Sequence, residues 1–196
     1  MPEITLDQIK SLREKTGIST MSCKKSLVEC DGDEQKAIEL LRKNGELKAQ
    51  ERSEKSTSEG MIVSYVHTNS KIGVLISLGC ETDFVARNDD FKNLGRDIAM
   101  HVAAMNPLYL SPEDVPPELV EKEVEIWKSE LVKEKKPQHI WDKILEGKIN
   151  KFTNEISLLK QPFVKNPDLT IEKLISEHIA KLGENIQIKR FVRLSI

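Results

Sequence analysis

Residues 80–88, Cys-Glu-Thr-Asp-Phe-Val-Ala-Arg-Asn, connect a predicted strand to a predicted helix. The preceding residues 72–78 form an alternating apolar run that is typical of a buried strand. Asn88 is followed by two aspartates, a pattern typical of a helix N-cap and first turn. We therefore expect Asp83 and Phe84 to lie on the short connection between the two elements.

Phe84 allows two interpretations at such a position. Its ring can pack beneath the following helix as part of the core, with Asp83 accepting hydrogen bonds from nearby backbone. Alternatively, both side chains can project outward and offer a partner an apolar anchor and a charge. The residues alone do not decide between these alternatives.

Residues 1–45 contain three short helical patterns separated by glycines. Their predicted starts are Thr5, Ser19 and Asp33, and their predicted ends are Gly17, Gly32 and Asn44-Gly45. Thr5 and Gln8 have the spacing of a capping box. Each helix is too short to be stable alone, so the three are expected to share one core and form a compact module.

Residues 46–60 mix both charge signs with serine and threonine and contain no apolar face. This composition predicts a helical extension that frays into a linker. The expected organisation is a module at residues 1–45, a linker at 46–60 and a core at 61–196, with the module able to move relative to the core.

The core is predicted to combine a small sheet with helices. Residues 61–66 and 72–78 are rich in β-branched side chains and flank a polar turn, which favours an antiparallel hairpin. The alternating residues 186–194 predict a third strand. Apolar stripes within residues 120–131 and 140–159 predict a helical hairpin. The fold class is α+β: a three-helix module, a linker, and an antiparallel sheet backed by helices and a helical hairpin.

Three further helix and edge predictions complete the core. A helix follows residue 88 with Phe91, Leu94 and Ile98 on its apolar face, and His101 is expected at the edge of the core. Residues 161–164 are expected to form an edge segment packed on the core. A last helix is expected to end at Gly183.

Composition excludes several classes of function. The 196 residues contain 30 basic and 32 acidic side chains, for a formal net charge of −2, so no basic excess favours a nucleic-acid partner. No apolar run reaches the roughly 18 residues of a membrane span, and residues 1–3 lack the character of a signal peptide. Cys23, Cys30 and Cys80 show neither disulfide-framework nor metal-site spacing, and a reducing cytoplasm is expected.

Nothing in the sequence is arranged for catalysis. Neither glycine-rich phosphate-binding pattern occurs, and the four histidines are scattered. His67 is expected to be exposed at a turn and Cys80 to be a buried apolar residue. We therefore expect no catalytic residue, no cofactor and no metal site.

Three separated motifs resemble the elongation factor Ts family. Residues 82–88 match the signature T-D-F-V-A-[RK]-N, and family-like stretches occur at residues 12–17 with 21–27 and at residues 179–186. They occur in the family's order and cover nearly the whole chain. The chain is identified as a member of this family by resemblance.

The resemblance implies a guanine-nucleotide exchange factor for the GTPase elongation factor Tu, and not an enzyme. It implies that Thr82, Asp83, Phe84 and Val85 reach the GTPase domain near its magnesium and phosphate-binding elements. The N-terminal module, of ubiquitin-associated type, is implied to contact the same domain from another side.

Within that module, the resemblance assigns the contact to Met21 and Lys24, whose neighbour Lys25 completes a basic pair. Thr20 departs from the family pattern, because many members have methionine there. This loss of apolar area is expected to weaken the contact locally.

A single core domain is typical of the short family members, which are expected to form homodimers and a 2:2 complex with the GTPase. The apolar stripes and an exposed edge strand at residues 186–194 also favour self-association. The alternative hypothesis is a ubiquitin-associated-type adaptor that binds a partner without exchanging nucleotide. Measuring GDP release from elongation factor Tu distinguishes the two.

Overall fold

The computed structural model describes residues 4–196. The expectation that residues 1–3 do not begin a signal peptide concerns residues outside that range. Helices are combined with a small antiparallel sheet, which confirms the predicted α+β class. The chain divides into two compact units, each described by itself. The first comprises the chain up to Val63 with Ser77–Arg96 and Lys173–Lys189, and the second comprises Ser64–Ile76, Asp97–Glu172 and Arg190–Ile196.

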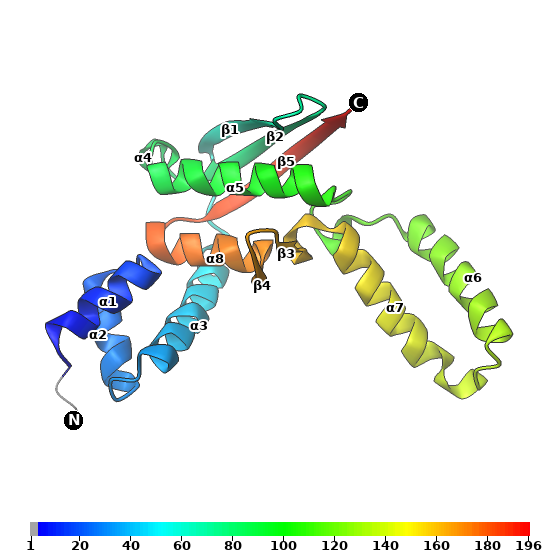
Figure 1. Cartoon of the computed structure of the whole chain (residues 1–196), viewed down its shortest axis with the longest axis horizontal. Coiled ribbons are helices and arrows are strands. Elements are labelled where there is room, and N and C mark those ends of the chain that lie inside the picture. Colours follow the sequence, from blue (N-terminus) through cyan, green and yellow to red (C-terminus); the bar gives the residue numbers. More distant parts are fainter. Residues whose placement is uncertain (1–3) are drawn as a thin grey trace. The chain divides into compact units, whose positions relative to one another are not determined.

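The first unit begins with the predicted three helices, shown in blue to cyan in Figure 1. They are α1 (Leu6–Thr16), α2 (Thr20–Glu29) and α3 (Glu34–Arg52). Thr5 forms the predicted capping box with Gln8, and Gly17 ends α1 in the left-handed conformation with φ 67°. The shared core of the three helices consists of Ile9, Leu12, Cys23, Leu27, Ala37 and Leu41. Each amphipathic helix is stabilised by this burial.

The predicted end of the third helix at Asn44-Gly45 is wrong, because α3 continues to Arg52. Gly45 instead faces α8 (Ile171–Leu182), where a Cβ added to it would lie 3.2 Å from the Cβ of Ala180. The glycine thus permits close approach of two helices and does not end one of them.

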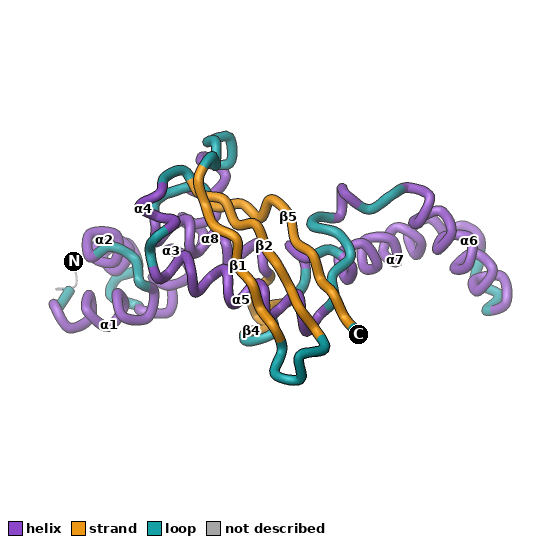
Figure 2. The backbone as a smooth tube through the Cα atoms, turned by 90° about the horizontal axis from the view of Figure 1, so that it is seen from above, coloured by secondary structure: helices purple, strands orange, loops and turns teal. Residues whose placement is uncertain are grey.

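The sheet has the order β1-β2-β5, with β1 at Glu59–Val66, β2 at Ile72–Cys80 and β5 at Ile186–Ser195 (Figure 2). The predicted hairpin is confirmed, and the His67 N–H closes it by donating to the Ile72 carbonyl at 2.9 Å. At the same end of β2, the Ile196 N–H at the end of β5 donates to the Lys71 carbonyl at 3.0 Å, so β5 is antiparallel to β2. His67 is exposed, as predicted.

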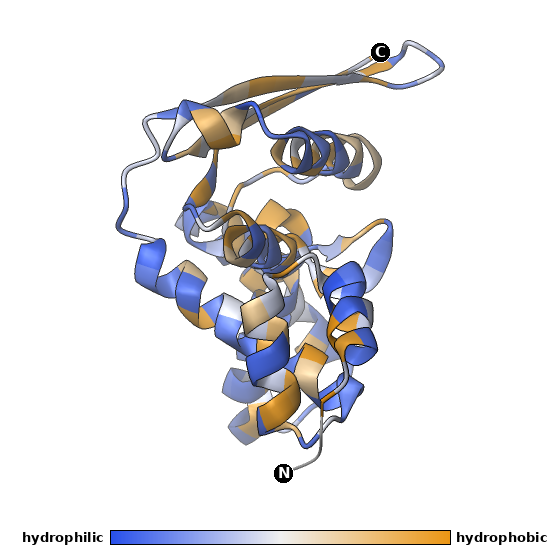
Figure 3. Ribbon diagram, turned by 90° about the vertical axis from the view of Figure 1, so that its left-hand side faces the viewer, coloured by the Kyte–Doolittle hydropathy of each residue, from blue (hydrophilic) through white to orange (hydrophobic). Residues whose placement is uncertain are grey.

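Helix α5 (Asp89–Met105) packs against one face of the sheet (Figure 3). A Cβ added to Gly95 would lie 2.5 Å from Cγ2 of Val63, so the backbone of the helix lies directly on the strand. The sheet residues on this side are buried: Val63, Val74, Ile76, Leu78, Cys80, Ile186 and Ile188. Burial of this apolar face explains the alternation of the strand sequences.

The second unit contains the predicted helical hairpin of α6 (Pro117–Lys133) and α7 (Trp141–Ile156), which lie side by side in Figure 1. The rings of Trp127 and Phe152 meet edge to face at 5.9 Å, and Lys148 pairs with Glu130 at 2.8 Å. Short 3-10 turns at Pro112–Asp114, Gln138–Ile140 and Leu158–Lys160 flank the two helices.

Residues 161–164 pack on the core as predicted, and they also form a pairing that was not predicted. The strand β3 (Pro162–Phe163) is antiparallel to β4 (Asn166–Thr170). His101 is fully buried beside them, with Nδ1 accepting from the Val164 N–H at 3.2 Å and Nε2 lying 3.0 Å from Oε1 of Gln161. The histidine is therefore a core residue with hydrogen bonds at both ring nitrogens, and burial lowers its pKa.

Candidate partner-binding site

The connection after β2 forms a single helical turn, α4 (Asp83–Ala86). Thr82 is its N-cap, and the threonine Oγ1 accepts from the Val85 N–H at 3.5 Å. The next helix begins at Asp89, where Oδ1 of Asn88 accepts from the Asp90 N–H at 2.8 Å. The predicted strand, connection and N-cap are thus all confirmed, and the connection is itself a short helix.

Phe84 projects outward from this turn, with 83% of its surface exposed. The interpretation of Phe84 as a core residue is therefore wrong. Asp83 is half-buried, and its carboxylate pairs with Arg87 one turn later at 3.0 Å. Val85 is also half-buried. The turn presents a free aromatic ring next to a carboxylate, the combination expected of a protein anchor.

Glu184 lies directly behind the turn, just after the end of α8. Its Oε2 accepts from the N–H groups of Glu81 at 3.1 Å and Thr82 at 3.0 Å, and its Oε1 accepts from the Thr82 hydroxyl at 2.6 Å. Sequence reasoning did not assign Glu184 a role, although the residue belongs to the third family-like motif.

The Glu81 side chain forms a second set of hydrogen bonds. Its Oε1 accepts from the Asn185 N–H at 2.6 Å and from Nη1 of Arg52 at 2.9 Å. The Asn185 N–H and, after it, the Arg52 guanidinium hold the pKa of Glu81 below its usual value. The Asn185 side chain in turn donates to the Lys55 carbonyl at 2.8 Å. Arg52 and Lys55, both within the predicted linker, are therefore bonded to Glu81 and Asn185.

Met21 and Lys24 are both exposed on α2, one turn apart, as the resemblance implied for a contact surface. Met21 is 78% exposed, and Val28 extends the same apolar face by two more turns. An open hollow on the helix surface is lined by Met21, Ser22, Lys24, Lys25, Val28 and Glu29. The surface combines apolar and basic groups.

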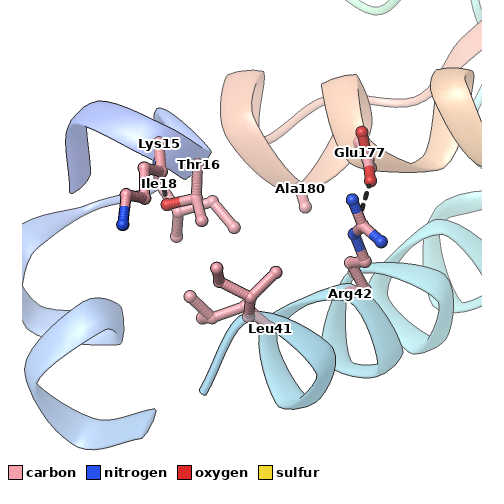
Figure 4. Close-up of a pocket in the computed structure, with 9 residues that line it drawn as sticks. Lys15, Thr16, Ile18, Leu41, Arg42, Glu177 and Ala180 are labelled. Atoms are coloured by element: carbon pink, nitrogen blue, oxygen red, sulfur yellow. Dashed lines mark hydrogen bonds and ion pairs between the residues drawn. The ribbon is translucent and has the colours of Figure 1, made fainter. Parts of the chain in front are cut away.

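A second, smaller pocket lies where α1 and α3 face α8 (Figure 4). Leu41 and Ile18 provide its apolar wall, and Arg42 pairs with Glu177 across one side at 3.1 Å. The charges of Arg42 and Glu177 neutralise each other in this ion pair. The pocket is a packing gap between helices.

The remaining titratable groups of interest are structural. Burial raises the pKa of the Cys80 thiol to about 11, which keeps it protonated and unreactive, in agreement with its prediction as a buried residue. Within residues 4–196, no group of three or more His, Cys, Asp and Glu side chains is placed to bind a metal ion. No helix in the same range is long and apolar enough to span a membrane.

An exposed aromatic turn and an apolar and basic helix face are features typical of a protein that binds another protein. Comparison with known proteins identifies the family. The family described as elongation factor TS matches residues 8–181. The chain therefore belongs to the elongation factor Ts family.

Individual relatives match nearly end to end. The chain is similar to elongation factor Ts of Syntrophus aciditrophicus, with 53% identity over 98% of this chain and 96% of the relative. It is similar to elongation factor Ts of Fervidobacterium nodosum, with 51% identity over 99% and 98%. The corresponding protein of Desulfosudis oleivorans is 47% identical over 100% and 99%.

Proposed function

We propose that this chain is a guanine-nucleotide exchange factor that binds elongation factor Tu with GDP and accelerates GDP release, so that GTP can bind. Nucleotide exchange on elongation factor Tu is the known role of the family to which the chain belongs. The observation that supports the proposal most directly is the exposure of Phe84, within the family signature, at 83%. Nucleotide exchange requires only non-covalent binding, because no covalent bond is made or broken.

The proposed mechanism uses differential binding. Thr82, Asp83, Phe84 and Val85 contact the GTPase domain near its magnesium and phosphate-binding elements. The Phe84 ring and the Asp83 carboxylate disturb this site, so magnesium and then GDP bind less tightly. Because coupling between two ligands is reciprocal, a factor that binds nucleotide-free GTPase more tightly must weaken nucleotide binding.

A second contact on the same domain is proposed for Met21 and Lys24. The module formed by residues 1–45 has a core of its own, which supports its assignment as a separate binding unit joined through residues 46–60 to the core at 61–196. Binding through two surfaces raises the effective concentration of the Phe84 turn at its site.

The proposal includes a homodimer that forms a 2:2 complex. β5 lies at an edge of the sheet, and apolar side chains of all three strands are exposed, among them Val66 on β1, Leu75 on β2, and Val192 and Leu194 on β5. Sedimentation at micromolar concentration tests this point, and a single species near the 22.3 kDa of one chain would contradict it. A cytoplasmic location and the absence of a nucleic-acid partner complete the proposal; the net charge of −2 supports the latter.

The decisive experiment follows the fluorescence of a labelled GDP released from elongation factor Tu. Wild-type protein should accelerate release, and Phe84→Ala should reduce the acceleration by about ten- to a hundredfold. Leu108→Ala is the matched control, because Leu108 is also exposed but belongs to neither proposed surface. Binding to the GTPase without any acceleration by the wild type would favour the adaptor alternative, for which the exposed face of α2 would suffice.

A further inference from the structure

We propose that Glu184 is a positioning residue for exchange: its carboxylate holds the turn that presents Phe84 in the binding-competent shape before the partner arrives. This inference rests on the proposed function. It concerns a side chain that lies behind the contact surface and acts through Thr82.

The turn needs support from behind because its front contributes little burial. α4 is a single turn of four residues, Asp83–Ala86, and a helix of that length is not stable on its own. The Phe84 ring is 83% exposed, so hydrophobic packing of that ring does not fix the backbone. The stabilising contacts must therefore come from polar groups beneath the turn.

Glu184 supplies these contacts with both carboxylate oxygens. One oxygen accepts from the two successive N–H groups of Glu81 and Thr82, which sets the direction of the backbone as it leaves β2. The other accepts from the Thr82 hydroxyl at 2.6 Å. Hydrogen bonds to an ionised acceptor are shorter and stronger than those between neutral groups.

The Thr82 hydroxyl connects Glu184 to the helical turn itself. The hydroxyl donates its single proton to Glu184. Its oxygen then accepts a hydrogen bond from the Val85 N–H, as the N-cap of α4. The carboxylate thus fixes the rotamer of the residue that caps α4. This is the step through which a group behind the turn determines how Phe84 is presented.

The bonds between the two segments are reciprocal. Glu184 accepts from the Glu81 backbone, and Glu81 accepts from the Asn185 backbone at 2.6 Å. Gly183, in the left-handed conformation with φ 78°, turns the chain at the end of α8 so that Glu184 and Asn185 reach residues 81–82. The carboxylates of Glu81 and Glu184 therefore join residues 81–82 to residues 184–185, about a hundred residues later in the sequence.

The expected effect is on apparent affinity. If only a fraction of free molecules has the competent turn, the apparent dissociation constant rises by the inverse of that fraction. Once bound, the partner itself holds the turn, so the maximal rate of GDP release should not change. A residue that itself disturbs the nucleotide site of the GTPase would change the maximal rate of GDP release.

The test measures GDP release from elongation factor Tu as a function of factor concentration. Glu184→Ala should need about tenfold more protein for half-maximal acceleration, with an unchanged plateau. Glu184→Gln should lie within about two- to threefold of wild type, because its amide oxygen still accepts both N–H groups and its NH₂ can donate to the Thr82 hydroxyl. In Glu184→Ala, the amide hydrogens of Glu81 and Thr82 should exchange with solvent faster than in wild type.

Thr82→Val and Thr82→Ser form an independent pair that leaves Glu184 in place. In the free protein, valine removes the hydroxyl and should speed exchange of the Val85 amide hydrogen with solvent, whereas serine retains the hydroxyl and should keep that hydrogen protected. This pair decides the matter if Glu184→Ala loses its circular dichroism and fails to fold.

Two results would overturn the inference while leaving the proposed function intact: wild-type half-maximal concentration and amide protection in Glu184→Ala, or a lowered plateau that glutamine does not restore. Failure of the proposed function has a different signature, namely no acceleration of GDP release by the wild-type protein. In that case the inference falls with it.

Discussion

Two phenylalanines on short segments have opposite surroundings in this molecule. Phe163, on the two-residue strand β3, is 5% exposed, whereas Phe84, on the one-turn helix α4, is 83% exposed. Both segments are held by a polar side chain distant in sequence. His101 bonds to the residues on either side of β3, and Glu184 bonds to the residues that begin α4.

The difference lies in what the polar side chain has to support. His101 is buried, and its Nδ1 accepts a hydrogen bond from the backbone N–H of Val164. The neighbouring Phe163 ring already contributes hydrophobic burial there. Glu184 is only half-buried and supports a turn whose ring faces water. β3 is therefore stabilised mainly by burial and α4 mainly by polar bonds, and the Phe84 ring remains exposed to solvent.

The largest expected effect is that of Phe163→Ala, which should lower the free energy of unfolding by about 3–5 kcal/mol, because it removes a buried ring and leaves a cavity. Urea denaturation followed by circular dichroism measures this change. Phe163→Leu is the control and should lose clearly less. A loss below about 1 kcal/mol in the alanine variant would show that burial is not what holds β3.

Phe84→Ala should produce the opposite pattern. The free energy of unfolding should stay within about 0.5 kcal/mol of wild type, since an exposed side chain contributes little to folding. The same denaturation assay, run beside the exchange assay, compares the two phenylalanines directly. A large drop in melting temperature, with unchanged exchange per folded molecule, would instead indicate that Phe84 is a core residue.

His101 gives the comparison a pH dependence. Burial lowers its pKa in the folded state, so the unfolded chain binds the proton more readily. The stabilisation is fully present above the unfolded value of 6.5 and is lost as the pH falls towards the lower folded value. The slope should be at most about 1.4 kcal/mol per pH unit. Denaturation of the wild-type protein between pH 7.5 and 5 measures this slope. A flat profile below the unfolded pKa would contradict the buried, neutral histidine.

The smallest expected effect concerns Glu81, which helps to hold the exposed turn. The Asn185 N–H and then Arg52 lower its pKa, so its contribution is present above the unfolded value of 4.5 and is lost as the pH falls through the lower folded value. The Asn185 amide hydrogen should therefore exchange faster with solvent in acid, after correction for the intrinsic rate. Glu81→Gln should abolish this dependence, and an identical pH profile in both proteins would refute the assignment.

Much of the fold could be predicted because local signals agreed with one another. The capping box of Thr5 and Gln8, the glycine ends at Gly17 and Gly183, and the strand alternation before Cys80 all occur where the sequence patterns placed them. Gly45 was misread for a physical reason. A glycine that ends a helix and one that admits a neighbouring helix have the same local sequence, and only the contact with Ala180 distinguishes them.

The candidate site was predicted only in part. The residues of the turn and of α2 were named through a family resemblance, which locates a signature but does not state what supports it. The support comes from Glu184, Arg52 and Asn185, which lie far from the turn in sequence. Long-range pairs of this kind have no periodicity, so no local pattern in a single sequence predicts them.

By itself, the sequence determined the α+β class, the positions of the caps and strands, and membership of a family through three motifs, because each of these depends on residues close together in the chain. Only the tertiary structure decided that Phe84 faces water while Phe163 is buried. Both are aromatic residues on short connections, and their exposure depends on which distant elements pack beside them. Phe163 lies in a segment bonded to the buried His101, whereas Phe84 has Glu184 behind it and solvent in front.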